Sequence, residues 1–174
     1  MSQQDEDYMS RTALGAELTR TELAMIRAIE AFSRWGTVLH KAVANAHLSY
    51  RDIAVLHAIR MCGNAQNLSE LMMFLNRNDV STLQYSLKKL EQEALVQRVT
   101  GKSKREAGYV LTEAGLDATE RYSAVREEIL LTLLEELRDF GPRLEAASSA
   151  IERLSGAYDQ AAQTVMNRRL SGKS

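Results

Sequence analysis

The sequence is poor in the residues that interrupt helices and in those that cross-link chains. Its 174 residues include one proline, nine glycines and one cysteine. A single cysteine excludes an intramolecular disulfide, and the shortage of breakers allows long regular helices. No apolar run approaches the roughly 20 residues that a membrane-spanning helix needs. The N-terminus is acidic and lacks the apolar stretch of a signal peptide, so we expect a cytosolic protein with no membrane partner.

Motifs of catalysis and of tight metal binding are also missing. The sequence has no glycine-rich phosphate loop, no His-Glu metalloprotease spacing and no nucleophile elbow. We therefore expect no enzyme, no catalytic residue and no cofactor. His40 and His47 are seven residues apart, which places them on one helix face about 10 Å apart, too far to share one metal. We expect ordinary histidines and no metal site; the alternative is a zinc sensor completed by Cys62 or by glutamates of a partner subunit.

Cys62 is the one thiol of the chain. It follows Met61 where a helix is expected to end, and we interpret it as a small packed residue. The alternative is a redox-sensitive thiolate stabilised by Arg60 or by the helix end.

The stretch from Leu68 to Leu111 has the most informative pattern in the chain. It predicts a short helix capped by Ser69, a polar turn, a longer helix from about Val80 to Ala94, and a hairpin of two strands. Leu68 is expected to add one residue of strand to this small sheet. A short helix and a tight turn set the second helix at a steep angle, so that its polar face projects outward and fits the major groove of DNA. The pattern therefore indicates a winged helix-turn-helix.

The longer helix has two distinct faces. Its apolar residues recur at steps of three and four, which is the spacing of one helical face: Val80, Leu83, Leu87, Leu90 and Ala94. The other side carries the polar candidates for DNA contact: Ser81, Thr82, Gln84, Tyr85, Lys88 and Lys89. Gln84 can pair bidentately with adenine, and Lys88 can reach guanine or a phosphate. In the short helix before it, Met72, Met73 and Phe74 are expected to lie in the core.

The ordered motifs resemble those of the multiple-antibiotic-resistance regulator (MarR) family. The matching segments are Asp79-Val80-Ser81-Thr82-Leu83, Leu87-Lys88-Lys89-Leu90-Glu91 with Leu95-Val96, and Leu111-Thr112-Glu113-Ala114-Gly115. The resemblance covers roughly residues 20–170 in element order. It implies a homodimer whose two recognition helices read a near-palindromic site in double-stranded DNA. It also allows for a small-molecule effector bound between the dimer part and the winged part, at residues that the sequence does not identify.

The hairpin tip departs from the family pattern. Family members often carry an Asp and Arg pair in a tip containing proline, whereas this chain has Gly101-Lys102-Ser103-Lys104-Arg105-Glu106. With Arg98 on the first strand, the cations Lys102, Lys104 and Arg105 are the candidate wing contacts. Arg105 is the best suited to a narrow, negatively charged minor groove. The alternative for this tip is an ordinary solvated loop.

The charge distribution favours the same region. The formal net charge is −1, but residues 76–105 hold seven basic and three acidic side chains, so this segment is +4 and the remainder is −5. Positive charge concentrated on the expected contact surface is the electrostatic pattern of a nucleic-acid-binding protein.

Long apolar stripes flank the winged part on both sides. The first helix, from about Ala16 to Ala46, carries a heptad-like stripe, and a helix capped by Thr112 and a last helix carry others. Between these two, Gly141 suits a helix end and Pro142 the first turn of the next helix. The winged part is too small to cover all these stripes, so we expect a second copy of the chain to do so.

The predicted fold class is mainly α (α+β), a winged helix-turn-helix with long N-terminal and C-terminal dimerisation helices. We expect one MarR-like domain over residues 1–174, with dimerisation helices at 16–47 and 112–170 and the DNA-binding part at 48–111. The expected function is sequence-specific transcriptional regulation on DNA. The alternative is a winged helix that binds protein and not DNA.

Overall fold

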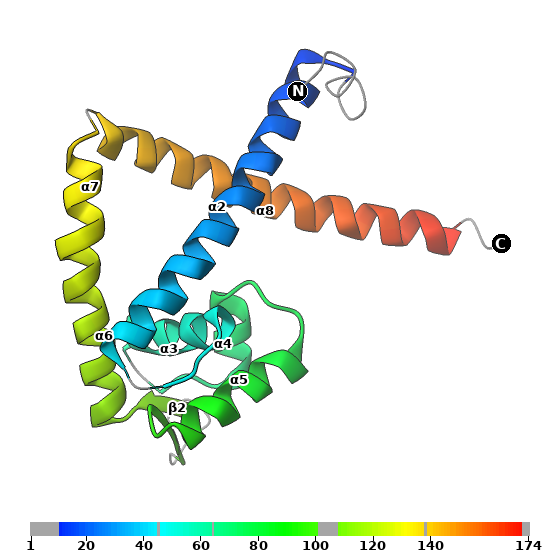
Figure 1. The fold of residues 1–174 in the computed structure, drawn as a ribbon. Coiled ribbons are helices and arrows are strands. Elements are labelled where there is room, and N and C mark those ends of the chain that lie inside the picture. Colours follow the sequence, from blue (N-terminus) through cyan, green and yellow to red (C-terminus); the bar gives the residue numbers. More distant parts are fainter. Residues whose placement is uncertain (1–10, 45, 64, 101–107, 138, 172–174) are drawn as a thin grey trace. The chain divides into compact units, whose positions relative to one another are not determined.

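The computed structural model describes residues 11–44, 46–63, 65–100, 108–137 and 139–171, and its elements are mostly helical (Figure 1). They are α2 (Ala13–Val43), α3 (Tyr50–Cys62), α4 (Leu68–Phe74), α5 (Val80–Gln92), β1 (Val96–Val99), β2 (Gly108–Leu111), α6 (Glu113–Arg126), the π-helix η1 (Glu127–Leu131), α7 (Thr132–Glu135) and α8 (Phe140–Ser171). The mainly helical fold with a small hairpin confirms the predicted class. The chain divides into two compact units, Met1–Arg126 and Glu127–Ser174. The assignment of the whole chain to a single domain stays a prediction.

Helix α2 begins and ends three residues earlier than expected. Thr12 caps it, because its hydroxyl oxygen accepts a hydrogen bond from the Gly15 amide at 3.1 Å. Only the C-terminal part of α2 contributes buried residues: Gly36, Leu39, His40 and Val43. Large apolar side chains of the helix are exposed, and all but Val38 lie before its buried part: Leu14, Leu18, Ile26, Ile29, Phe32 and Val38. The helix thus joins the core of the first unit at one end and carries uncovered apolar surface along the rest.

The starts of α3 and α4 are set by capping boxes. Ser49 caps α3 as expected, and Asp52 completes the box. The expectation that Ser69 caps α4 was wrong, because Asn67 fills that position. The Asn67 side chain accepts from the Glu70 amide at 3.1 Å, and the Glu70 carboxylate accepts from the Asn67 amide at 2.8 Å. The reciprocal pair satisfies two amides that Ser69 could not reach together, so α4 begins at Leu68.

Helix α5 begins at Val80 as expected and ends at Gln92, two residues early. Asp79 caps it by accepting from the Thr82 amide at 3.2 Å. Its predicted apolar face is buried at Leu83, Leu87 and Leu90. Val80 is instead 41% exposed. Ala94 is exposed and has left the helix with a φ of 55°.

The hairpin forms where it was predicted. Strands β1 and β2 pair antiparallel, with Arg98 opposite Tyr109. The extra strand residue is Gln66 and not Leu68, because Gln66 exchanges backbone hydrogen bonds of 3.0 and 2.9 Å with Tyr109. Leu68 belongs to α4. Gly108 allows this close approach, since a Cβ there would lie 2.6 Å from the Gln66 carbonyl oxygen.

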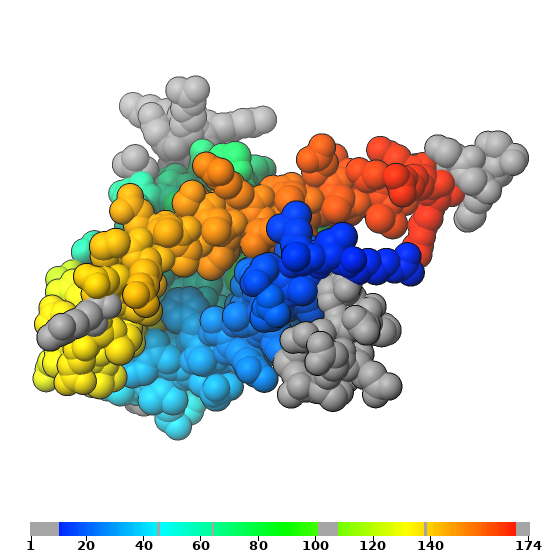
Figure 2. Space-filling view, turned by 90° about the horizontal axis from the view of Figure 1, so that it is seen from above, coloured from blue at the N-terminus to red at the C-terminus, as the bar shows by residue number. Residues whose placement is uncertain are grey.

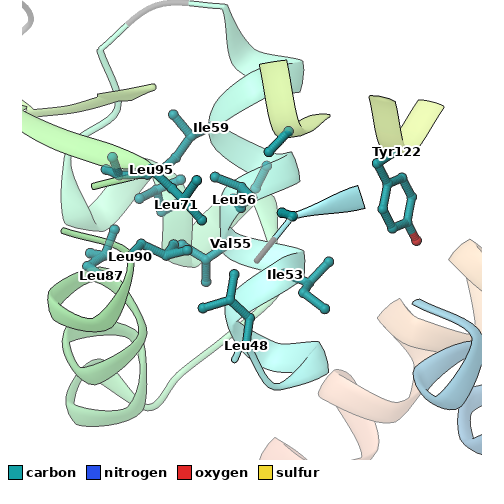
Figure 3. Close-up of a cluster of buried hydrophobic side chains, with 14 of the residues drawn as sticks. Leu48, Ile53, Val55, Leu56, Ile59, Leu71, Leu87, Leu90, Leu95 and Tyr122 are labelled. Carbon is teal, nitrogen blue, oxygen red and sulfur yellow. The ribbon is translucent and has the colours of Figure 1, made fainter. Parts of the chain in front are cut away.

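The core of the first unit lies between the helices of the winged part (Figure 3). Its most buried members, from α3, α4 and α5, are Val55, Leu56, Leu71, Leu83, Leu87 and Leu90. The expectation for the methionines of α4 holds for Met72, which packs against this core. It was wrong for Met73 and Phe74, which are 80% and 49% exposed because they lie on the outer side of a single short helix.

The second unit consists of η1, α7 and the 32-residue α8, which is the orange-to-red helix of Figure 2. Pro142 lies in the first turn of α8, as predicted. Gly141 also lies inside α8 and does not end the preceding helix. Asp139 makes the reversal instead, with a φ of 58°. Aspartate tolerates this left-handed conformation better than most residues, so glycine is not needed there.

Two of the three histidines are packed near each other in the first unit. His40 of α2 is 1% exposed, and the ring of His57 of α3 lies tilted against the ring of Tyr122 of α6, with centroids 4.4 Å apart. Both rings have nitrogen atoms without a hydrogen-bond partner. Helix α2 ends at Val43, so the expected shared helix face for His40 and His47 was wrong, and His47 is exposed.

This packing predicts a loss of stability in acid. Burial lowers the pKa of His57 to about 4, helped by the neighbouring His40, whose own pKa burial also lowers. The unfolded chain therefore binds more protons below pH 6.5. The stabilisation from a neutral His57 is complete above about pH 6.5 and is lost as pH falls towards 4, by about 3 kcal/mol. Urea unfolding across this range measures it. His57→Gln should flatten the profile, and an unchanged slope in that variant would contradict the assignment.

Candidate nucleic-acid interface

The outer face of α5 carries four of the ten predicted contact residues. Ser81, Gln84, Tyr85 and Lys88 are exposed, with Tyr85 at 68%. The opposite face is held in the core by its three leucines. The fold therefore presents a polar helix face of hydroxyl, amide, phenol and ammonium groups. These are the groups that hydrogen-bond to base edges and phosphates in a DNA groove.

Thr82 is engaged at the start of α5. Its hydroxyl donates a hydrogen bond to the Asp79 carboxylate, and its amide donates to the same side chain. These bonds lower the pKa of Asp79. The structure thus places Thr82 in the cap of the helix.

Lys89 lies apart from the exposed face. Its ammonium is 3.2 Å from the carboxylate of Asp52 on α3, whose side chain is only 3% exposed. The same carboxylate accepts from the amide and hydroxyl of Ser49 at 2.9 and 2.7 Å. Burial alone would raise the pKa of Asp52, but the bonds from Ser49, Ser86 and Lys89 outweigh burial and lower it. Lys89 therefore ties α5 to α3, a role that the sequence pattern did not predict.

The neighbouring lysines give a matched pair of substitutions. Lys89→Met is expected to destabilise the fold by about 3 kcal/mol, because it leaves the buried Asp52 carboxylate without its cation. Lys88→Met should change stability by about 0.5 kcal/mol or less, because Lys88 is exposed. Urea denaturation of the two variants at neutral pH makes the comparison. Equal losses of stability would contradict the distinction between the two lysines.

The wing contributes Arg98, which is exposed on β1. The other predicted wing contacts, Lys102, Lys104 and Arg105, lie outside the described residues. Their contact with DNA remains a prediction.

A hollow of about 530 Å³ lies where α4, α5 and the hairpin meet. Its lining brings together Gln84 and Arg98, both predicted contacts. It adds residues that the sequence analysis missed, among them Ser69, Thr100 and Tyr109. In the sequence, Gly108 was the one signal of this site, because a glycine within a strand often marks a place where another backbone approaches closely.

Other kinds of site have less support in the described part of the chain. It contains no group of three or more His, Cys, Asp or Glu side chains placed to hold a metal ion. Cys62 is a free, partly buried thiol at the end of α3. Among the described helices, none is long and apolar enough to cross a membrane.

Comparisons with known proteins agree with this geometry. Residues 48–115 match the family model of the winged helix DNA-binding domain. No curated protein matches the sequence. Similar solved structures include the DNA complex of the Mycobacterium tuberculosis transcriptional regulator MosR, with 18% identity, a TM-score of 0.60, and coverage of 80% of this chain and 96% of that one.

Two further structures have the same fold. A MarR/EmrR family transcriptional regulator from Acinetobacter sp. ADP1 has 17% identity and a TM-score of 0.65, with coverage of 82% of this chain and 98% of that one. The Staphylococcus aureus MepR–DNA complex has 15% identity and a TM-score of 0.57, with coverage of 73% and 91%. This chain therefore has the fold of the MarR-family transcriptional regulators, and its residues 48–115 match the winged helix DNA-binding domain.

Proposed function

We propose that this protein is a transcriptional regulator that binds double-stranded DNA in a sequence-specific manner. The observation that carries the proposal is the exposed polar face of α5, with Gln84 and Lys88 outward and Leu83, Leu87 and Leu90 in the core. A helix held in this way can enter a major groove without disturbing the fold. We propose Ser81, Gln84, Tyr85, Lys88 and Arg98 as contacts, with Lys102, Lys104 and Arg105 of the tip.

Charge and structural likeness support the same proposal. The segment 76–105, which contains α5 and the hairpin, carries a net charge of +4 in a chain of net charge −1. The similar structures of MosR and MepR are described as complexes with DNA. Neither the winged-helix family nor the regulators of this fold are a class of enzyme. We also propose that the protein is cytosolic, where it can reach DNA.

The regulator is proposed to act as a homodimer on a near-palindromic site. In α2, apolar side chains such as Ile26, Ile29 and Phe32 are more than half exposed. In α8, Leu144, Ile151 and Val165 are 45%, 49% and 54% exposed. A second copy of the chain can cover both stripes isologously about a two-fold axis. Two recognition helices related by that axis would read two half-sites of one operator.

A small-molecule effector is the proposed means of release from DNA. Such a molecule would bind best to a dimer whose two recognition helices no longer match the spacing of the half-sites. Effector and DNA would then lower each other's affinity by the same factor.

A selection from random double-stranded DNA tests the function. The purified protein should enrich a near-palindromic motif with half-sites about one helical turn apart. It should also protect that motif from nuclease cleavage. Failure to enrich any sequence, combined with salt-insensitive weak binding, would refute the proposal and favour a protein-binding winged helix.

Gln84 gives a specific prediction within this function. Gln84→Ala should relax the preference for one base pair in each half-site, at a cost of about 1–3 kcal/mol there. Gln92→Ala is the matched control, because Gln92 is exposed in the last turn of the same helix. Selection with each variant measures the motif. An identical motif for wild type and Gln84→Ala would remove Gln84 from the base-reading residues.

A further inference from the structure

We propose that the hollow between α4, α5 and the hairpin holds one phosphate of the DNA backbone in each half-site, bound by Arg98 and Ser69. This inference rests on the proposed function and identifies the part of the fold that would hold the DNA backbone. The hollow has a volume of about 530 Å³ and is lined from three separate elements. Ser69 comes from α4, Gln84 from α5, and Arg98 with Thr100 from β1 and the residue after it.

The lining has the chemistry of a phosphate site. Arg98 supplies a guanidinium, which can donate two parallel hydrogen bonds to phosphate oxygens. Ser69 and Thr100 carry hydroxyl groups and Gln84 an amide, and Tyr109, which also packs against the core, completes this side of the lining. Among the described residues that line the hollow, none carries a carboxylate. The acidic side chain of α4 closest in sequence, Glu70, is engaged by the Asn67 amide at 2.8 Å. A cation with neutral donors and no opposing charge favours an anionic oxygen ligand.

The exposure of the lining favours a polymer over a small phosphorylated molecule. Pockets for small ligands bury most of the surface of the ligand. Here Ser69, Gln84, Arg98 and Thr100 are all exposed. Gln84 also belongs to the outer face of α5, so a phosphate in the hollow would lie beside the residue proposed to read a base. A phosphate held at this point would set the register of the recognition helix on the duplex.

A double-mutant cycle, which combines substitutions in the protein with substitutions in the DNA, tests the contact between Arg98 and the phosphate. The selected DNA site is made with single phosphates replaced, one at a time, by uncharged methylphosphonates. For the wild-type protein, one position per half-site should weaken binding by about tenfold or more, since a hydrogen bond to a charged group is lost. With Arg98→Gln, the loss at the same position should be much smaller than for the wild type, and only the part due to Ser69 should remain. Ser69→Ala should reduce the loss at that position, and Arg98→Lys should restore part of it.

Matched controls separate this contact from general electrostatics. Arg121→Gln removes the same charge from an exposed site on α6, and Ser123→Ala removes an exposed hydroxyl of that helix. Both should keep the wild-type pattern of phosphate losses. Thermal unfolding of Arg98→Gln, Arg98→Lys and Ser69→Ala checks that each variant is folded.

The outcomes distinguish this inference from the proposed function. One outcome is that the wild type binds DNA, while the loss of affinity caused by Arg98→Gln adds to the loss caused by the methylphosphonate at every position. In that case the hollow is not the phosphate site and the proposed function stands. If the wild type binds no DNA, the proposed function itself fails. If a free nucleoside monophosphate binds at micromolar concentration and Arg98→Gln abolishes that binding, the hollow serves a small ligand and the backbone assignment is overturned.

Discussion

Gly115→Ala is expected to destabilise the first unit by about 3 kcal/mol, as overpacking against rigid structure does. A Cβ at this position would lie 2.0 Å from the carbonyl oxygen of Leu95. That carbonyl also accepts the Thr112 amide at 3.1 Å, and the Thr112 hydroxyl donates to the Ala94 carbonyl at 2.6 Å. The backbone before β1 is therefore tied to the start of α6, and neither side can yield without losing these bonds.

The matched control is Gly156→Ala, in the interior of α8. Nothing lies within 4 Å of a Cβ built at Gly156. Alanine is the better helix former by about 1 kcal/mol, so this variant should be as stable as the wild type or more so. Urea denaturation followed by circular dichroism compares the two. Similar stability changes for Gly115→Ala and Gly156→Ala would show that the junction between Leu95 and α6 can relax.

Local signals predicted the winged part well, because caps and periodicity are encoded within a few residues. Ser49 and Thr112 start α3 and α6 as their hydroxyl groups suggested. The cap of α4 was misjudged, because Ser69 was predicted and Asn67, two residues earlier, fills that position. The presence of Glu70 three residues after Asn67 completes a capping box, and that reciprocal pattern is the better guide.

Periodicity predicts which side chains share a face but not what covers that face. The stripe of α5 was confirmed at three leucines because α3 packs against them. The same reasoning failed for Met73 and Phe74, since α4 is a single short helix with one covered side. Periodicity also did not predict the π-helix η1, which follows α6 directly and begins at Glu127.

The candidate site could be predicted only as a set of residues on one helix and one hairpin. Lys88 and Lys89 are adjacent in sequence and about 100° apart around the helix. This rotation places Lys88 in solvent and Lys89 against Asp52, which is 37 residues earlier in the chain. The hollow likewise joins Ser69 to Arg98 through tertiary packing. Contacts at such separations depend on how the helices pack, and no short motif records them.

Ile151→Glu is expected to weaken the proposed homodimer by several kcal/mol, since it places an unpaired charge in a buried interface. The apolar residues of α8 recur at intervals of seven: Leu144, Ile151, Tyr158 and Val165. Each is between 40% and 54% exposed in the single chain. A seam with this repeat is typical of helices that pack against a partner helix. Ile151 lies in the central part of the seam, so a carboxylate there could not easily reach water in the dimer.

Gln160→Glu is the matched control, because it adds the same charge to an exposed polar position on the same helix. Sedimentation equilibrium over nanomolar to micromolar concentrations should show a dimer for the wild type and for Gln160→Glu. Ile151→Glu should be largely monomeric, with its dissociation constant raised about a hundredfold or more, as several kcal/mol requires. Its affinity for the palindromic DNA site should fall with the dimer, while a single half-site should bind both variants equally. A wild type that is monomeric at micromolar concentration would refute the dimer, and a dimeric Ile151→Glu would exclude Ile151 from its interface.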